Sequence, residues 1–386
     1  MAKILNKASL VFILPLIALN LSGCLGISNN KNDRAAANGH QGVFKSVDGG
    51  KTWEQRVKID ENNRIDGVSI TNIFMDPNNK ETLYVGTKSS GLFKSENAAE
   101  NWQKVEGGLL SSNAAVYDLA VEKGNSQVIY LAVLQNGVGE LLKTTNGGKE
   151  WLSSHIISQE GKAVSAVAID PFEKNVVYIG TEQGGFLKSV NWGKEWVSIH
   201  WFENPVRKII FDYTNNNGVF VKTDKTIFKS VNKGLEWSDL GKKINSKEKG
   251  GKNYGVDMSK ISSLTMDPNN PLVLYVSYLN FMLRSDDGGE SWKKLNTITP
   301  SQSADGSIPQ IKRVGISKVD SRIIYYGAGS ALYKSEDFGE SWMSYRIPIK
   351  GDVRYTLSDP ENKDVLYIVA FYTPPPKKKK NPFLPY

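Results

Sequence analysis

The chain contains one cysteine and three histidines among its 386 residues. A single cysteine excludes an intrachain disulfide, so packing and hydrogen bonding must hold the fold together. His40, His155 and His200 lie far apart in the sequence, and the cysteine falls near the N-terminus. Zinc and copper sites in proteins are built from clustered Cys and His ligands. We therefore expect no metal site and no other cofactor.

The chain also lacks the concentrated positive charge that nucleic-acid binding requires. Its formal net charge is +8, but Lys3, Lys7 and the four lysines 377–380 supply much of it. The rest of the chain is nearly neutral, which argues against nucleic acid as a partner. Helical periodicity is almost absent, so no glycine-rich phosphate loop stands before a helix.

No apolar run is long enough to suggest a membrane-spanning helix. The run Ala8–Leu19 follows a short basic region and is typical of a secretory signal. It leads into Leu21–Cys24, which reads Leu-Ser-Gly-Cys and resembles a bacterial lipobox. We predict a lipoprotein signal peptide over 1–23, lipidation of Cys24 with a flexible tether over 24–41, and attachment to the extracytoplasmic side of a bacterial envelope membrane. The alternative is an uncut signal anchor with an incidental cysteine.

What the chain has in abundance is a repeat, first seen in Gly42–Trp53. Each copy has Ser or Thr, then Asp or Asn two positions later, usually a Gly two further on, and a Trp seven after the Ser or Thr. Seven copies at this spacing predict a propeller or a solenoid. Their Asp or Asn and Trp residues are Asp48 and Trp53, Asn97 and Trp102, Asn146 and Trp151, Asn191 and Trp196, Asn232 and Trp237, Asp287 and Trp292, and Asp337 and Trp342.

Each copy predicts a tight β-hairpin. Alternation such as Phe44, Lys45 and Ser46 ends one strand, and the Asp or Asn accepts backbone N–H bonds within its own turn. The Gly supplies a positive φ, and the Trp begins the return strand and is buried between neighbouring units. The second copy has Ala98 and Ala99 instead of glycines. We expect its turn to be distorted, although still anchored by its Trp.

The segment Ser46–Trp53 matches the Asp-box, or BNR, pattern Ser-x-Asp-x-Gly-x-Thr-Trp throughout. The resemblance covers nearly all of residues 42–370. The chain is similar to the propellers of sialidases, sortilin-type receptors, xyloglucan-cleaving glucanases and photosystem II assembly factors. In those proteins the box is a structural turn far from the ligand site, so the resemblance implies a structural role for the box residues here.

A second motif recurs between the boxes, most clearly in Met75–Thr87, where Asp-Pro-Asn turn chemistry is flanked by short apolar strands. Each repeat therefore has four strands, like a propeller blade. The chain begins with the third and fourth strands of a blade and ends with a first and second. We predict an all-β, seven-bladed β-propeller of four-stranded blades over 42–372, closed by pairing of Val43–Ser46 with Leu366–Ala370.

This topology divides the connections between two faces. The Asp-Pro turns and the boxes share one face, here called the box face, and the remaining connections share the opposite face, here called the insertion face. Irregular connections gathered on one rim often carry function. The long insertions are expected at Gln55–Gly67, Leu152–Lys162, Ser198–Val206, Asp239–Lys260 and Lys293–Lys312.

Two adjacent aromatics on the insertion face, Trp201 and Phe202, have no role in the repeat. Exposed aromatic rings are good platforms for sugar rings or apolar side chains, so we predict that they bind a ligand together with nearby Arg207. Alternatively, they fill the channel or pack between blades. Tyr254 is a further candidate, because it lies in the longest insertion among lysines that suit an acidic partner or an anionic glycan: Lys247, Lys249 and Lys252.

Catalytic chemistry has weaker support. Tyr345–Pro348 resembles the Tyr-Arg-Ile-Pro motif of sialidases, but it follows the seventh box, whereas in sialidases the motif precedes the boxes. Glycosidases need two carboxylates at the scissile bond, and no motif selects a pair or any other catalytic residue. The carboxylates expected on the insertion face are Asp60, Asp66, Glu203, Asp257 and Asp305.

The sequence thus favours a monomeric, lipid-anchored propeller that binds an unidentified protein or glycan through its insertion face, as a non-enzymatic binding or assembly scaffold. The alternative is a surface glycoside hydrolase or lyase acting on a polysaccharide. The Pro- and Lys-rich segment 373–386 predicts a disordered tail. This tail is either simply solvated or attracted to anionic lipid headgroups or an acidic partner.

Overall fold

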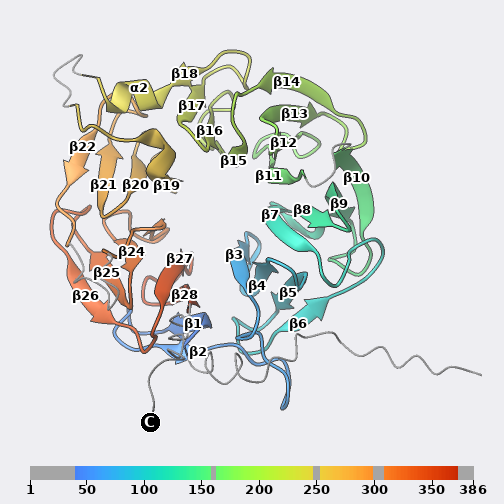
Figure 1. The fold of residues 1–386 in the computed structure, drawn as a ribbon, viewed down its shortest axis with the longest axis horizontal. Coiled ribbons are helices and arrows are strands. Elements are labelled where there is room, and N and C mark those ends of the chain that lie inside the picture. The colour runs from blue at the N-terminus through green and yellow to red at the C-terminus, as the bar shows by residue number, and fades with distance from the viewer. Residues whose placement is uncertain (1–39, 158–161, 247–252, 299–307, 373–386) are drawn as a thin grey trace, which may run out of the picture.

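A computed structural model describes residues 40–157, 162–246, 253–298 and 308–372. The predicted signal peptide, Cys24, nearly all of the tether, the tail, Asp305 and the three lysines near Tyr254 lie outside the described residues. Within these residues, the strands form seven four-stranded antiparallel sheets, arranged as blades around a common axis (Figure 1). The predicted seven-bladed, nearly all-β propeller is confirmed.

The first blade is built from both ends of the propeller. Its order is β2-β1-β28-β27. Val43 pairs with Val369 and Ser46 with Leu366, so the predicted pairing of these two segments is confirmed. The strands are β1 (Gly42–Ser46), β2 (Glu54–Gln55), β27 (Asp352–Ser358) and β28 (Leu366–Phe371).

The other six blades each use four consecutive strands, with the first strand nearest the axis (Figure 1). Blades two to four are β3 (Ile70–Asp76), β4 (Asn79–Thr87), β5 (Leu92–Ser95) and β6 (Gln103–Val105); β7 (Ala115–Glu122), β8 (Asn125–Gln135), β9 (Val138–Thr144) and β10 (Leu152–Ile157); and β11 (Val164–Ile169), β12 (Val177–Thr181), β13 (Gly185–Ser189) and β14 (Val197–Trp201). Blades five to seven are β15 (Val206–Phe211), β16 (Val219–Thr223), β17 (Ile227–Ser230) and β18 (Ser238–Asp239); β19 (Ile261–Met266), β20 (Leu274–Tyr278), β21 (Phe281–Ser285) and β22 (Lys293–Leu295); and β23 (Val314–Ile316), β24 (Ile324–Ala328), β25 (Ala331–Ser335) and β26 (Met343–Arg346).

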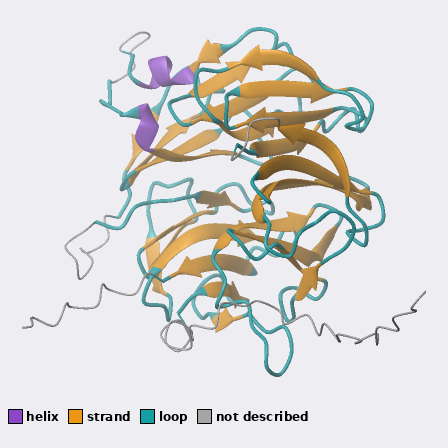
Figure 2. Ribbon diagram, turned by 45° about the vertical axis from the view of Figure 1, so that its right-hand side comes forward, coloured by secondary structure: helices purple, strands orange, loops and turns teal. Residues whose placement is uncertain are grey.

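Two of the predicted insertions are shorter than expected. The first half of 152–162 is strand β10, and 198–201 is the end of β14, so only a short connection follows each strand. The insertion after β18 contains the helix α2 (Leu240–Ile244) and the 3₁₀ turn η2 (Met258–Lys260). The two lie near each other at one edge of the ring (Figure 2). No helix in the described part of the chain is long and apolar enough to cross a membrane.

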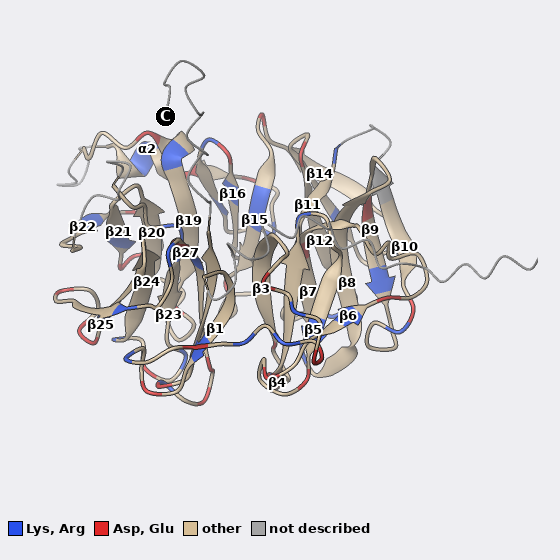
Figure 3. Cartoon of the chain, turned by 60° about the horizontal axis from the view of Figure 1, so that its bottom comes forward, with Lys and Arg blue, Asp and Glu red and all other residues tan. Residues whose placement is uncertain are grey.

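The two-face arrangement rests on a hydrogen bond that recurs in every blade. The residue after the box Asp or Asn donates its N–H to a carbonyl in the turn before the second strand or near the start of that strand, as Gly49 does to Asp364 at 2.9 Å and Phe338 does to Arg322 at 2.9 Å. Boxes and Asp-Pro-type turns are therefore adjacent on one face. In Figure 3, red acidic segments lie in loops along both the lower and the upper edge of the propeller.

Side-chain hydrogen bonds fix the box turn. The Ser46 Oγ accepts from the Gly50 N–H at 2.9 Å and donates to Asp48 at 2.8 Å, and Asp48 accepts from the Thr52 N–H at 2.9 Å. The backbone turns through two successive positive φ values, 75° at Gly49 and 97° at Gly50.

The prediction of a distorted second box is wrong. Ala98 and Ala99 keep positive φ values of 56° and 70°, and Ser95 and Asn97 make the same bonds as in the other copies, with the Ala99 N–H 3.0 Å from the Ser95 Oγ. A non-glycine residue in this region costs about 1–2 kcal/mol. The side-chain hydrogen bonds offset that cost.

Acid should weaken the boxes that contain Asp. The Thr52 hydroxyl holds the pKa of Asp48 at about 2, and the Ser341 hydroxyl holds that of Asp337 at about 2, against the usual 3.8. A carboxylate whose pKa is lower in the folded state than in the unfolded state stabilises the fold above pH 4. This stabilisation is lost as the pH falls towards 2. Urea-unfolding midpoints should therefore drop between pH 4 and pH 2.

The double variant Asp48→Asn, Asp337→Asn should show a shallower drop over that interval, because Asn already occupies this position in four boxes with the same backbone bonds. An unchanged slope in the double variant would place the acid-sensitive groups elsewhere.

Candidate functional site

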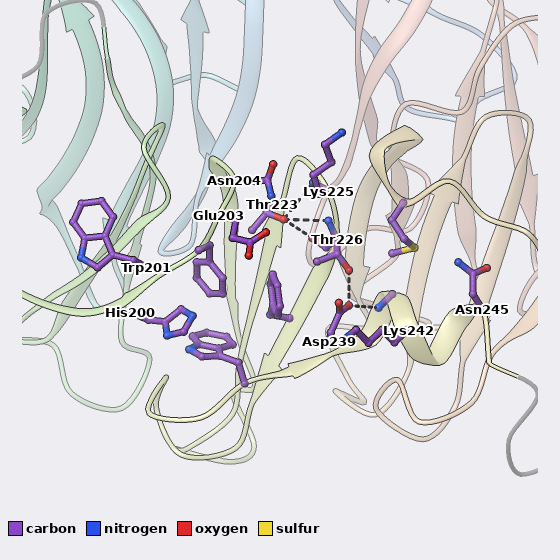
Figure 4. Close-up of a pocket in the computed structure, with 15 residues that line it drawn as sticks. His200, Trp201, Glu203, Asn204, Thr223, Lys225, Thr226, Asp239, Lys242 and Asn245 are labelled. Carbon is purple, nitrogen blue, oxygen red and sulfur yellow. Dashed lines mark hydrogen bonds between the residues drawn. The ribbon is translucent and has the colours of Figure 1, made fainter.

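The described insertion face bears a cavity of about 880 Å³ over blade five. It is formed where the end of β14, the β16–β17 turn, β18, α2 and η2 meet (Figure 4). We call it the aromatic pocket. Its lining residues are His200, Trp201, Phe202, Glu203, Asn204, Thr223, Lys225, Thr226, Phe228, Trp237, Asp239, Gly241, Lys242, Asn245 and Met258.

The aromatic wall of the pocket is a packed cluster. The ring of Phe202 lies 4.5 Å from His200, 4.8 Å from Phe228 and 5.1 Å from Trp237, measured between ring centroids. Burial lowers the pKa of His200, which favours a neutral imidazole at pH 7. The wall is therefore rigid and uncharged.

Trp201 and Phe202 have different environments. Trp201 is the last residue of β14 and is 61% exposed, whereas Phe202 is 5% exposed within the core between blades four and five. Phe202 is the first residue after β14, and its ring is packed in that core. Trp201 is thus available as a platform. For Phe202 the alternative interpretation holds, because it packs between blades.

The polar side of the pocket is partly held in place by its own hydrogen bonds. Asp239 accepts from the Thr226 hydroxyl at 2.6 Å and from the Gly241 N–H at 2.8 Å, so it caps the start of α2 (Figure 4). The Asn245 side-chain amide donates to the Val256 carbonyl and accepts from the Val256 N–H, each at 2.9 Å. Glu203 forms no hydrogen bond or ion pair with another described residue. Its carboxylate and the exposed amines of Lys225 and Lys242 can meet a ligand.

The other predicted ligand residues have structural partners. Arg207 makes two bonds to Asp224, at 2.7 and 2.8 Å, and one to Glu182 at 3.2 Å. This pair lowers the pKa of Asp224. Tyr254 packs against the core of blade six and donates to the Trp292 carbonyl at 3.1 Å. Neither lines the aromatic pocket.

The carboxylates expected on this face do not converge. Asp60 accepts from the backbone of Asn62 and Asn63 in its own loop, Asp66 pairs with Arg64, and Asp257 caps η2. Glu203 alone of the expected set lines the pocket. No pattern in the sequence predicts Lys225, Thr226 or Asp239 as neighbours of Trp201, because these residues belong to the next blade, in the β16–β17 turn and at the end of β18.

Comparison with known proteins agrees with the fold. The model of the family described as "DUF6242 beta propeller domain" matches residues 101–371. Xyloglucanase Xgh74A of Acetivibrio thermocellus is 32% identical over 129 residues, which are 30% of this chain and 15% of that protein. The chain therefore spans a small part of that relative.

Two solved structures have the same fold at low identity. A GH74 xyloglucanase from Xanthomonas campestris superposes with a TM-score of 0.62 at 15% identity, over 85% of this chain and 52% of that chain. YCF48 bound to a D1 peptide superposes with a TM-score of 0.57 at 12% identity, over 82% of this chain and 100% of that chain.

Proposed function

The chain belongs to the DUF6242 beta propeller domain family, and on that premise we propose that it is a monomeric extracytoplasmic binding propeller that holds a protein segment or a glycan in its aromatic pocket. Lipidation of Cys24 would attach it to a bacterial envelope membrane, as the lipobox-like sequence suggests.

The exposed indole of Trp201 beside the aromatic pocket carries this proposal. An apolar concavity with a few polar groups at its edge is the usual form of a binding site. An exposed tryptophan next to a rigid wall can add apolar contact to a sugar ring or a side chain at low entropic cost. Glu203, Lys225 and Lys242 supply polar contacts at the rim.

The structural neighbours support both ligand classes. One is named a xyloglucanase, and the other was solved with a peptide bound. At these identities they share the fold alone, so the choice between peptide and glycan rests on binding measurements with this chain.

Trp201→Ala should weaken binding while leaving the fold intact. We expect a loss of at least about tenfold in affinity, the effect of removing an aromatic anchor, with a melting curve close to wild type because the side chain is exposed. Isothermal titration calorimetry with xyloglucan oligosaccharides and with the D1 peptide tests both classes.

Trp192→Ala is the matched control, because Trp192 is also exposed, at 48%, but belongs to a box. Binding that falls equally in both variants, or in neither, would contradict a site at the aromatic pocket.

A glycoside hydrolase is the second candidate, favoured by the unpaired carboxylate of Glu203 in the pocket. Hydrolysis with two carboxylates requires a partner across the scissile bond, and Asp239, the other carboxylate of the lining, is engaged as a helix cap. Release of reducing ends from xyloglucan by the purified chain, abolished by Glu203→Gln, would establish the enzyme and displace the binding proposal.

A further inference from the structure

Three cations gather at the insertion-face ends of the inner strands of blades seven and one. Lys312 and Arg313 immediately precede β23, and Arg354 is the irregular residue of β27, where the pairing shifts between Val353 and Tyr355. The strands β23 and β27 are neighbours in the ring (Figure 3). The chain order therefore places the three residues at the same end of two adjacent inner strands, a region here called the cationic sector.

Arg313 is held on an aromatic face. Its guanidinium carbon lies 4.6 Å from the centroid of the Tyr355 ring, and its Nη1 is 3.4 Å from the Asn72 Oδ1. The Tyr355 hydroxyl in turn donates to the carbonyl of Thr71 in the neighbouring blade. The Tyr355 ring under Arg313 is therefore held by its backbone in β27 and by the hydrogen bond of its hydroxyl.

Arg354 is held in the same way. Its guanidinium carbon lies 3.7 Å from the centroid of the Phe371 ring, at the end of β28. The Arg354 side chain is otherwise exposed. Stacking fixes the plane of a guanidinium while leaving its in-plane N–H donors free.

These two arginines differ from most others in having no carboxylate partner. In the described part of the chain, neither Arg313 nor Arg354 forms an ion pair. Other arginines in that part do pair with Asp or Glu: Arg56, Arg64, Arg207, Arg284 and Arg322. Arg207 occupies the same irregular position of its inner strand as Arg354. At this strand position, blade five thus supplies carboxylate partners for Arg207, whereas among the described residues of blade one none pairs with Arg354.

Lys312 adds a third positive charge to the cationic sector. Its Nζ donates to Gln310 at 2.6 Å. Burial lowers its pKa, with nearby Asp352 raising it and Arg354 lowering it further. Asp352 is thus a carboxylate near Lys312, and its single negative charge does not cancel the charges of all three cations.

We propose that Lys312, Arg313 and Arg354 form an oxyanion site that takes a carboxylate or phosphate group. A planar guanidinium fork matches the paired oxygens of either group, and such charge-assisted bonds are roughly twice as strong as neutral ones. This site is separate from the aromatic pocket, because β27 and β28 lie across the ring from β14 to β18 (Figure 1).

Titration of the full-length chain with inorganic phosphate and with succinate, at constant ionic strength, tests the site by calorimetry. We expect saturable binding of at least one anion and a loss of affinity of about fivefold or more in Arg313→Gln and in Arg354→Gln. Arg354→Lys should also bind more weakly, because it keeps the charge but loses the planar fork. Phosphate binding alone indicates a phosphate-bearing ligand, and succinate binding alone a carboxylate-bearing one.

Arg346→Gln is the matched control, since Arg346 is exposed at the end of the outer strand β26 on the same face and forms no ion pair in the described residues. Melting curves show whether each variant is folded. Equal affinity in wild type and the Arg313→Gln, Arg354→Gln double variant would overturn the site, as would an equal loss in Arg346→Gln. Trp201→Ala should leave anion binding unchanged, so this site and the aromatic pocket can fail independently.

Discussion

Deletion of residues 364–386 should abolish the cooperative unfolding transition of the propeller. The deletion removes β28, which pairs with β27 on one side and with β1 on the other. It also removes apolar side chains that are at most 3% exposed, at Leu366, Tyr367, Ile368 and Val369. Burying each contributes about 1.5–3 kcal/mol, so their sum is comparable to the total stability of a typical domain, about 5–15 kcal/mol.

The shorter deletion of residues 374–386 is the control for this experiment. The segment has a Pro- and Lys-rich sequence without a strand pattern, so its removal should leave the melting curve close to wild type. Scanning calorimetry of both truncated chains makes the comparison. Two similar melting curves would mean that pairing of β1 with β28 does not hold the ring together.

Trp151→Ala should destabilise the propeller by about 3–5 kcal/mol, the usual cost of removing a large buried aromatic. Trp151 is fully buried in the core between blades two and three, with Leu110, Leu131 and Leu142. Its indole N–H has no hydrogen-bond partner in the described residues, so the loss should come from the cavity. Urea unfolding measures the change.

Trp192→Ala is also the control here, and its expected change is small. Trp192 is half exposed. The Tyr130 hydroxyl and the Lys143 amine both donate hydrogen bonds to its backbone carbonyl, and not to its side chain. An alanine keeps that carbonyl. If the two tryptophan variants unfolded at the same urea concentration, burial of the Trp151 side chain would not explain how the box Trp stabilises the fold.

The periodic part of the sequence predicted most of the fold. The boxes, the Asp-Pro turns and the offset of the termini indicated the blade number and the closure, because each depends on local turn chemistry that repeats. The second box shows the limit of that reasoning. Ala98 and Ala99 suggested distortion, but the Ser95 hydroxyl and the Asn97 side chain accept backbone N–H bonds that hold the turn at positive φ.

The candidate sites were less predictable, because they depend on neighbours from other blades. Trp201 and Phe202 are adjacent in sequence, but Phe202 is buried because it packs against residues of blades four and five. Arg207 and Arg354 occupy equivalent positions, yet Arg207 meets Asp224 and Glu182 while Arg354 meets Phe371. No spacing in the sequence distinguishes the paired arginine from the stacked one.

The shared first blade also has a consequence for the timing of biosynthesis. The ribosome adds about 5–20 residues per second, so the roughly 320 residues between Ser46 and Leu366 separate the two partner strands by about 16 to 64 s. Until then β1 lacks its inner partner and presents an open edge, which can pair with another chain. A chain released before β28 is made would keep the unpaired edge of β1. Quality-control proteases would be able to recognise this open edge, which a closed propeller lacks.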